Sequence, residues 1–181
     1  MIVCAGKNET FSFALPIGVG LVESAINLTR LALFDPPEYL LFIGTAGSYG
    51  KCKLFDIIES STAANVELAF IQKSAYTPID NVIDASDVSR ETKEKVIVNS
   101  SNYITTNFNE AQKFRSYGLE LENMEFFSVV SVAREFEIPV KGIFIVTNYC
   151  NTDAHNDFLK NHEKAKDKLT EYLHKRGWIE R

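Results

Sequence analysis

The sequence predicts an α/β fold in which a central mixed β-sheet lies between layers of helices, forming a three-layer sandwich. Two continuous apolar runs, over residues 39–44 and 140–146, are typical of strands buried on both faces. Strand patterns alternate with helical patterns along the chain, as in proteins whose sheets carry helices on their faces. The 181 residues contain no repeat, linker or low-complexity segment, so we expect a single domain spanning residues 1–181.

Strand and helix patterns follow one another through the first hundred residues. The turn residues Gly6 and Asn8 join two strand patterns, so the chain is expected to begin with a hairpin. The first helix should end before Pro36, and the glycines from Gly44 to Gly50 should open a loop. The predicted elements are strands over residues 1–5 and 11–17, a helix over 21–34, strands over 39–44, 54–60, 67–72 and 95–98, and an irregular segment over 77–89.

The segment after Gly118 is the most informative part of the chain. It predicts a helix that is apolar on nearly all sides, with one carboxylate, Glu125, between Met124 and Phe126. Because removing a carboxylate from water is costly unless hydrogen bonds replace the hydration, a Glu here suggests a polar ligand. The elements expected around it are a short helix over residues 107–116, a strand over 140–146 and an amphipathic helix over 153–175.

Composition excludes several classes of partner. The net charge of −5 argues against a surface for nucleic acid or anionic membranes, and no apolar run approaches the roughly 20 residues that span a bilayer. The three cysteines are odd in number and form no CxxC pair, which favours reduced thiols in a cytoplasmic protein. His155 and His162 match no zinc spacing, so no metal site is expected.

Polar residues follow both core strands. Thr45 and Ser48 lie in the glycine-rich stretch after the first, while Thr147 and Asn148 end the second. Ligands of open α/β sheets bind outside the carboxyl ends of the strands, so we expect these groups and Glu125 to line one crevice. Taken alone, the GTAGS stretch is more often a tight turn than a ligand loop.

The order of these features resembles the purine nucleoside phosphorylase and methylthioadenosine nucleosidase superfamily over nearly the whole chain. The glycine-rich stretch is similar to its Gly-Ser-Ala-Gly loop, the Glu125 segment to its Met-Glu pair, and the end of the second core strand to its Ser-Asp or Thr-Asn pair. The matching residues are Gly44-Thr45-Ala46-Gly47, Met124-Glu125, Thr147-Asn148, the PIGVG turn from Pro16 to Gly20, and the segment from Ser101 to Ile104. The resemblance implies a phosphorylase/hydrolase-like sandwich.

The resemblance also implies a role for each matched residue. Glu125 and Asn148 would be catalytic, because a carboxylate on the ribose hydroxyls stabilises the cation-like transition state of N-glycosidic cleavage. Met124 would pack against the sugar, and Tyr103 would stack on the purine. The implied substrate-binding residues are Met124, Tyr103, Ile104, Thr147 and Gly18, and the implied phosphate-binding residues are Gly44, Thr45 and Ser48.

Asn148 bears on the choice of substrate. Family members that cleave 6-aminopurines usually carry Asp there, which delivers a proton to N7, whereas an amide suits the O6 and N7 of a 6-oxopurine. The resemblance therefore implies a purine nucleoside phosphorylase-like enzyme that cleaves inosine- or guanosine-type nucleosides. It also implies a homodimer or higher homo-oligomer, no cofactor, and inorganic phosphate as a possible co-substrate.

Two departures from the family pattern keep other functions open. The chain starts at the predicted hairpin, so the family's first strand-helix unit, which carries the water-activating Glu of nucleosidases, looks absent. Glu9 is expected to lie in a turn without a role, and Phe42 stands where many phosphorylases have an Arg for phosphate. The alternatives are a non-catalytic nucleoside- or purine-binding protein, a nucleoside hydrolase, and a scaffold without a ligand.

The candidate residues also have purely structural interpretations. Glu125 would form an ion pair with Arg134 or a Lys, Met124 and Tyr103 would pack in the core, and Asn148 would cap a turn. Only the joint pattern favours a nucleoside site.

Overall fold

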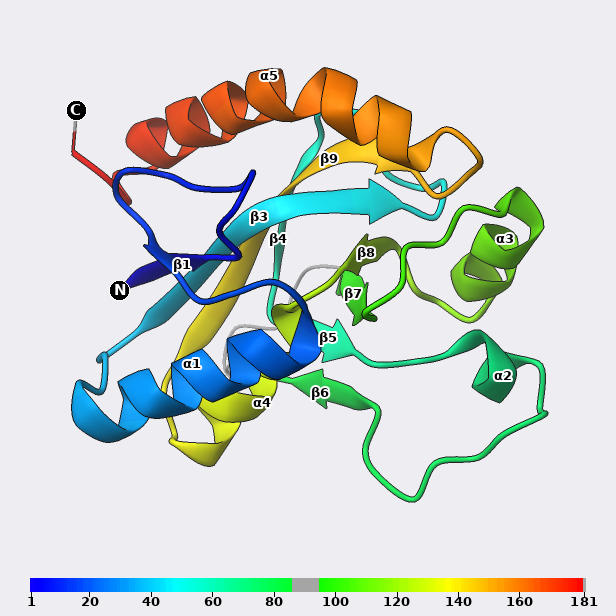
Figure 1. Ribbon diagram of the computed structural model, residues 1–181, viewed down its shortest axis with the longest axis horizontal. Helices are drawn as coiled ribbons and strands as arrows, with labels where there is room; N and C mark the ends of the chain where they lie inside the picture. The colour runs from blue at the N-terminus through cyan, green and yellow to red at the C-terminus, as the bar shows by residue number, and fades with distance from the viewer. Residues whose placement is uncertain (86–94, 181) are drawn as a thin grey trace.

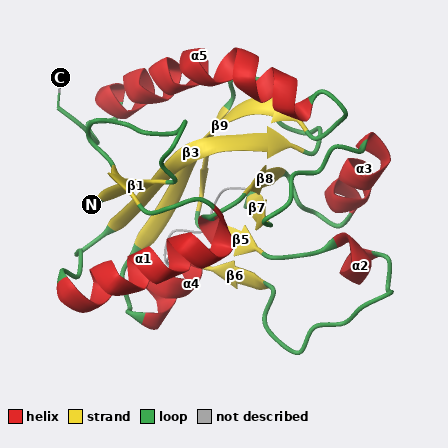
Figure 2. Cartoon of the chain, in the orientation of Figure 1, coloured by secondary structure: helices red, strands yellow, loops and turns green. Residues whose placement is uncertain are grey.

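The computed structural model describes residues 1–85 and 95–180 and has the predicted layers (Figure 1). Helix α5 (Ala154–Lys175) covers one face of the central sheet, while α1 (Gly20–Phe34) and α4 (Phe126–Glu135) cover the other. The short helices α2 (Leu68–Ile71) and α3 (Phe108–Ser116) lie beyond the carboxyl end of the long central strands (Figure 2). The expected sandwich with a mixed sheet is therefore confirmed.

The strands of the described residues form one nine-stranded sheet. Its order is β2-β1-β3-β8-β7-β5-β6, and β9 pairs with both β3 and β4. The strands are β1 (Ile2–Cys4), β2 (Leu15–Pro16), β3 (Leu40–Ser48), β4 (Ile57–Ser60), β5 (Thr62–Ala64), β6 (Val82–Asp84), β7 (Ile97–Ser100), β8 (Leu121–Asn123) and β9 (Val140–Tyr149). The two longest strands, β3 and β9, pair in parallel and form its centre.

Among the described strands, one edge of β3 is fully paired, and the other edge is paired only at its two ends. Along one edge, β3 pairs with β9 from Leu40 to Ser48. Along the other edge, β1 pairs with the start of β3 at Leu41 and Phe42, and β8 pairs with its end at Gly47 and Ser48. Within the described part of the chain, residues 43–46 therefore have no strand partner on this second edge. Their backbone groups must find hydrogen-bond partners elsewhere.

Alternating side chains of β3 build two separate cores. Leu41 and Ile43 point toward α5 and pack with its Leu169 and Leu173. Phe42 points to the opposite face, where its ring lies 6.0 Å from that of Phe126 on α4. The period of two along a strand buried on both faces explains why the sequence of β3 is apolar at nearly every position.

The predicted N-terminal hairpin is wrong. β1 and β2 run parallel, with Val3 opposite Leu15, and β1 also runs parallel to β3. The turn chemistry at Gly6 is real, since Glu9 N–H donates to the Gly6 carbonyl at 3.0 Å. That turn only reverses the chain locally, and the segment between Ala5 and Ala14 then crosses over to place β2 beside β1.

Several other expectations need correction. The glycine-rich stretch from Gly44 to Ser48 is the second half of β3 and not a loop. The strand expected over residues 67–72 is the single-turn helix α2. The segment 77–89, expected to be irregular, contributes β6, and its residues 86–89 lie outside the described residues. The helix expected after Gly118 begins later than predicted. Residues 121–123 form β8, and Glu125 is the N-cap of α4.

The other predicted elements agree with the structure within a few residues, whereas β5 had no predicted counterpart. They are the helices α1, α3 and α5, the strands β4 and β7, and the core strand β9. None of the helices in residues 1–85 and 95–180 combines the length and apolar character that crossing a bilayer requires.

Candidate active site

A cavity of about 270 Å³ opens at the division of the sheet, where β3 lacks a strand partner. Its walls are residues 5–9 of the β1–β2 connection, residues 45–47 of β3, residues 122–125 after β8, and the start of α5. Small-molecule sites typically enclose about 300–1,000 Å³, so this cavity suits a compact ligand. Glu125 and Asn148 both line it, as the predicted crevice requires.

Glu125 is held where the N-termini of two helices meet. Its side chain is 3% exposed, and its Oε1 accepts a hydrogen bond from the N–H of Gly20, the first residue of α1, at 2.9 Å. The N–H groups of Glu125 and Phe126 donate to Oδ1 of Asn123, each at 2.9 Å. Burial and then the nearby charge of Glu9 raise the pKa of Glu125 to about 7. This carboxyl group therefore titrates near neutral pH.

Gly20 is required for this contact. Its φ of +84° is a left-handed conformation that residues with a side chain rarely adopt. A Cβ there would also lie 2.7 Å from Oδ1 of Asn102. The glycine thus allows its own N–H to reach Glu125 while Asn102 accepts from the N–H of Leu21 at 2.9 Å.

Glu9 occupies the unpaired edge of β3. Its carboxylate accepts from the Thr45 N–H at 3.1 Å and from the Thr45 hydroxyl, while the Thr45 carbonyl accepts from Nδ2 of Asn123 at 3.1 Å. Both backbone groups of Thr45 are thereby satisfied by side chains in place of a strand. Burial raises the pKa of Glu9, although the hydrogen bonds from Thr45 and the nearby His162 and Lys166 oppose the shift. A second carboxyl group with a raised pKa thus lines the cavity beside Glu125.

Sequence analysis assigned Glu9 no role. Its partner Thr45 is 36 residues away, and the parallel pairing of β1 with β3 that brings them together was not predicted. One signal was available, because Glu9 follows shortly after the end of a strand, at the edge where ligands of such sheets bind.

Asn148 has a fixed amide orientation. Its Oδ1 accepts from the hydroxyl of Thr147 at 2.9 Å, and its Nδ2 donates to the carbonyl of Tyr149 at 3.2 Å. A flipped amide would place an oxygen against that carbonyl, which is unfavourable. The amide therefore has one further N–H for a ligand in the cavity. The side chain of Asn161 supports this arrangement from α5 by donating to the Thr147 carbonyl at 2.8 Å.

The predicted site residues separate into two groups. Those that line the cavity are Glu125, Met124, Asn148, Thr45 and Ile104. Those that do not line it are Tyr103, Thr147, Gly18, Gly44 and Ser48. Tyr103 is 82% exposed, Thr147 is buried beneath Asn148, and the Ser48 hydroxyl donates to the Cys52 carbonyl at 2.7 Å. Gly18, with φ +100°, packs against Glu23, and its neighbour Val19 faces the cavity instead.

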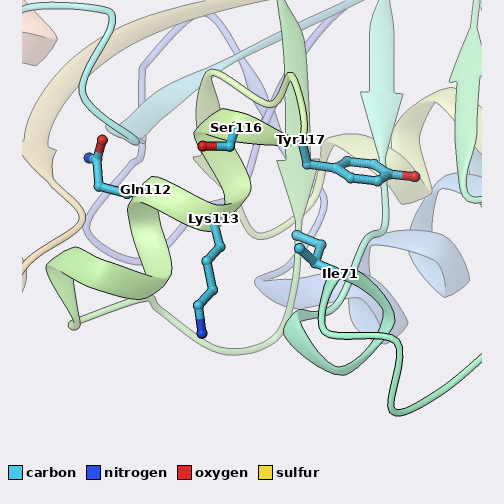
Figure 3. Close-up of a pocket in the computed structure, with 5 residues that line it drawn as sticks. All are labelled: Ile71, Gln112, Lys113, Ser116 and Tyr117. Atoms are coloured by element: carbon cyan, nitrogen blue, oxygen red, sulfur yellow. The ribbon is translucent and has the colours of Figure 1, made fainter.

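A second hollow, of about 340 Å³, lies between α2 and α3. It is lined by Ile71, Gln112, Lys113, Ser116 and Tyr117, whose side chains point in different directions (Figure 3). Polar groups of a ligand site converge, so the cavity at β3 is the better candidate. Among the described residues, no group of three or more His, Cys, Asp or Glu side chains is placed to hold a metal ion.

The cavity lies at the carboxyl edge of a mixed sheet and is lined by the Glu125 carboxylate and the Asn148 amide. This position and these polar groups are typical of small-molecule sites in α/β proteins. The family model of the phosphorylase superfamily matches residues 2–175, and the chain belongs to this superfamily. The family expected from the sequence is thus confirmed. A comparison with curated proteins gives no match.

Solved structures of nucleoside-cleaving proteins share the fold. A futalosine hydrolase mutant from Helicobacter pylori is 16% identical, with 95% of each chain covered and a TM-score of 0.79. The H. pylori nucleosidase MTAN with 5'-methylthioadenosine in its active site is 18% identical, with 88% of this chain and 77% of that chain covered and a TM-score of 0.75. The Streptococcus pneumoniae 5'-methylthioadenosine/S-adenosylhomocysteine nucleosidase with a transition-state inhibitor is 13% identical, with 95% of each chain covered and a TM-score of 0.75. At these identities, the likeness shows the fold alone.

We predict that Glu125→Gln stabilises the protein increasingly as the pH rises. The pKa of Glu125 is raised from 4.5 to about 7 in the folded state, so its contribution to stability is full below 4.5 and is lost as the pH rises through 7. Glutamine does not titrate. The free energy of unfolding of the variant relative to wild type should therefore increase by about 2 kcal/mol between about pH 5 and pH 8.

Urea denaturation at the two pH values measures this difference. The control is Glu135→Gln, at an exposed position of the same helix. An identical pH dependence in both variants would show that the Glu125 carboxyl group is not the source.

Proposed function

We propose that the protein hydrolyses the N-glycosidic bond of a purine nucleoside. Glu9 is the general base for water, Glu125 binds the ribose hydroxyls, and Asn148 binds the departing purine. The observation that carries the proposal is that two carboxyl groups with raised pKa values, Glu9 and Glu125, line the same cavity as the amide of Asn148. Perturbed pairs of this kind are typical of catalytic sites.

The proposed reaction has one bond-breaking step. As the bond between the anomeric carbon and the purine nitrogen breaks, its electron pair leaves with the base, and the ribose acquires cationic character that the Glu125 carboxylate stabilises. Water attacks the anomeric carbon and gives a proton to Glu9. The remaining N–H of Asn148 donates a hydrogen bond to the purine, which takes its proton from solvent.

Water is favoured over phosphate as the nucleophile. The N–H and hydroxyl of Thr45, which the sequence suggested as phosphate donors, are both bound to the Glu9 carboxylate. A second negative charge at that position would be repelled, and the Ser48 hydroxyl donates to the protein backbone. Lys7 also lines the cavity and favours phosphorolysis as the second candidate, so the two nucleophiles have to be compared directly.

A 6-oxopurine nucleoside of the inosine or guanosine type is the proposed substrate. Asn148 cannot deliver a proton to N7, whereas its fixed N–H group can stabilise a base that leaves with negative charge on its oxygen and nitrogen atoms. A 6-aminopurine, which leaves less readily as an anion, would need an acid at this position.

A homodimer is the proposed assembly. The outward face of α1 carries Val22, Ile26 and Leu33 at helical spacing, and these side chains are 55–65% exposed. Phe34, at the end of the same helix, is 83% exposed. Exposed apolar side chains gathered on one helix are typical of a subunit interface, and a second copy of the chain offers the same surface for a twofold contact.

We predict that wild-type protein releases hypoxanthine from inosine at the same rate with and without phosphate. Glu9→Gln should lower kcat by about 10²–10⁴-fold, because general base catalysis is lost. The kcat/KM of the wild type should fall as the pH drops below about 7, because Glu125 acts ionised and its pKa is raised to about 7. Glu9 also acts ionised, and its raised pKa adds to the fall in the same direction.

Base release is followed by chromatography, with Glu38→Gln, on the exposed surface, as the matched control. Release that depends on phosphate would establish phosphorolysis instead. Inosine binding without release would establish a non-catalytic binding protein.

We predict that Asn148→Asp changes the base preference. The carboxyl group can deliver a proton, so kcat/KM for adenosine relative to inosine should rise at least about tenfold, which corresponds to about 1.4 kcal/mol in the barrier. Asn156→Asp adds the same charge at an exposed position of α5 and should leave the ratio unchanged. An unchanged ratio in Asn148→Asp would place the purine elsewhere.

We predict that Ile26→Lys converts the protein from a dimer to a monomer. A charge on the apolar face of α1 cannot be desolvated in an interface without a large cost. Light scattering coupled to size exclusion measures the mass. Ile79→Lys, at another exposed isoleucine, is the control and should remain dimeric. A wild-type protein that is monomeric at all concentrations would refute the assembly.

A further inference from the structure

We propose that Glu122 is a positioning residue that holds residues 101–105 against the base-binding end of the cavity. The inference rests on the proposed function, because it takes the cavity wall formed by residues 101–105 as the wall that contacts the purine. Neither the Met-Glu pair nor the strand-end motifs of the sequence pointed to Glu122. It stands three residues before Glu125 at the end of β8.

The segment in question connects β7 to α3 and carries two large hydrophobic side chains that are exposed, Tyr103 and Ile104. Ile104 lines the cavity, and Tyr103 precedes it. The segment is fixed on either side of this pair. Asn102 accepts from the N–H of Leu21 at the start of α1, and Thr105 donates to Glu122 from its N–H at 2.9 Å and from its hydroxyl at 2.5 Å. Tyr103 and Ile104 thus lie between two attachments.

Glu122 has its acceptor capacity filled by protein groups. A carboxylate has about four acceptor positions. Besides the two bonds from Thr105, the hydroxyl of Tyr49 donates at 2.9 Å and the thiol of Cys150 lies at 3.8 Å. The side chain is 7% exposed, so it depends on these donors in place of water. With its positions occupied, Glu122 is suited to hold the segment and not to bind the purine itself.

The place of Glu122 in the sheet links the purine wall to the ribose site. It pairs with Gly47 of β3 and with Asn99 of β7. The next residue, Asn123, binds the Thr45 carbonyl and the N–H of Glu125. One strand end therefore sets the position of the wall at Ile104 and of the carboxylate at Glu125. Loss of the Thr105 attachment should weaken base binding and leave the chemistry of the ribose end nearly unchanged.

The test removes a single hydrogen bond from the network. Thr105→Val keeps the shape of the side chain and deletes the hydroxyl, Thr105→Ser restores the hydroxyl, and Thr106→Val is the matched control at the exposed neighbouring position. Calorimetry measures hypoxanthine binding, steady-state kinetics measures inosine cleavage, and amide hydrogen exchange monitors residues 101–106.

Thr105→Val should raise the Kd for hypoxanthine and the KM for inosine about five- to tenfold, with kcat within about twofold, as expected for one lost hydrogen bond to a charged group. Exchange of residues 101–106 should become faster. Thr105→Ser and Thr106→Val should behave like wild type. Wild-type hypoxanthine affinity in Thr105→Val would overturn the proposal, whether or not exchange becomes faster. An inability of the wild type itself to bind hypoxanthine or cleave inosine would instead refute the proposed function on which it rests.

Discussion

The site depends on a short stretch of β3 that has no strand on one edge. The N–H and carbonyl of Thr45 face this edge in the interior, and unpaired backbone groups there would cost as much as lost hydrogen bonds. Glu9 and Asn123 satisfy them, so side chains take the place of a strand along this edge between β1 and β8. The cavity opens beside these side chains. A missing strand pairing thus creates both the space for a ligand and the groups that line it.

Three carboxylates share this region, and each is bound to a backbone N–H from a distant part of the chain. Glu9 binds Thr45, Glu122 binds Thr105, and Glu125 binds Gly20. These contacts attach the β1–β2 connection, the segment before α3 and the start of α1 to the sheet. Burial raises the pKa of all three carboxyl groups. Their ionisation therefore costs the folded protein stability, and the same burial provides the reactive carboxylates that the proposed function uses.

Sequence analysis succeeded where local pattern decides the structure. The apolar runs of β3 and β9 and the stripe of α5 follow from periodicity, and the family resemblance singled out Glu125, Met124 and Asn148, which do line one cavity. It failed where a residue or strand distant in the sequence determines the local structure. The parallel course of β1 depends on β3, and the place of Glu9 depends on that course, so a turn signal at Gly6 suggested a hairpin instead. The hydrogen bonds of Glu122 could not be predicted for the same reason.

A crystal structure of the Glu9→Gln variant with inosine would test the central claim most directly. The account predicts that both ribose hydroxyls lie about 3 Å from the Glu125 carboxylate, with the purine between Ile104 and the Nδ2 of Asn148 and a water molecule at residue 9. Inosine bound outside this cavity, or bound within it with Glu125 and Asn148 contacting neither the ribose nor the base, would contradict the account.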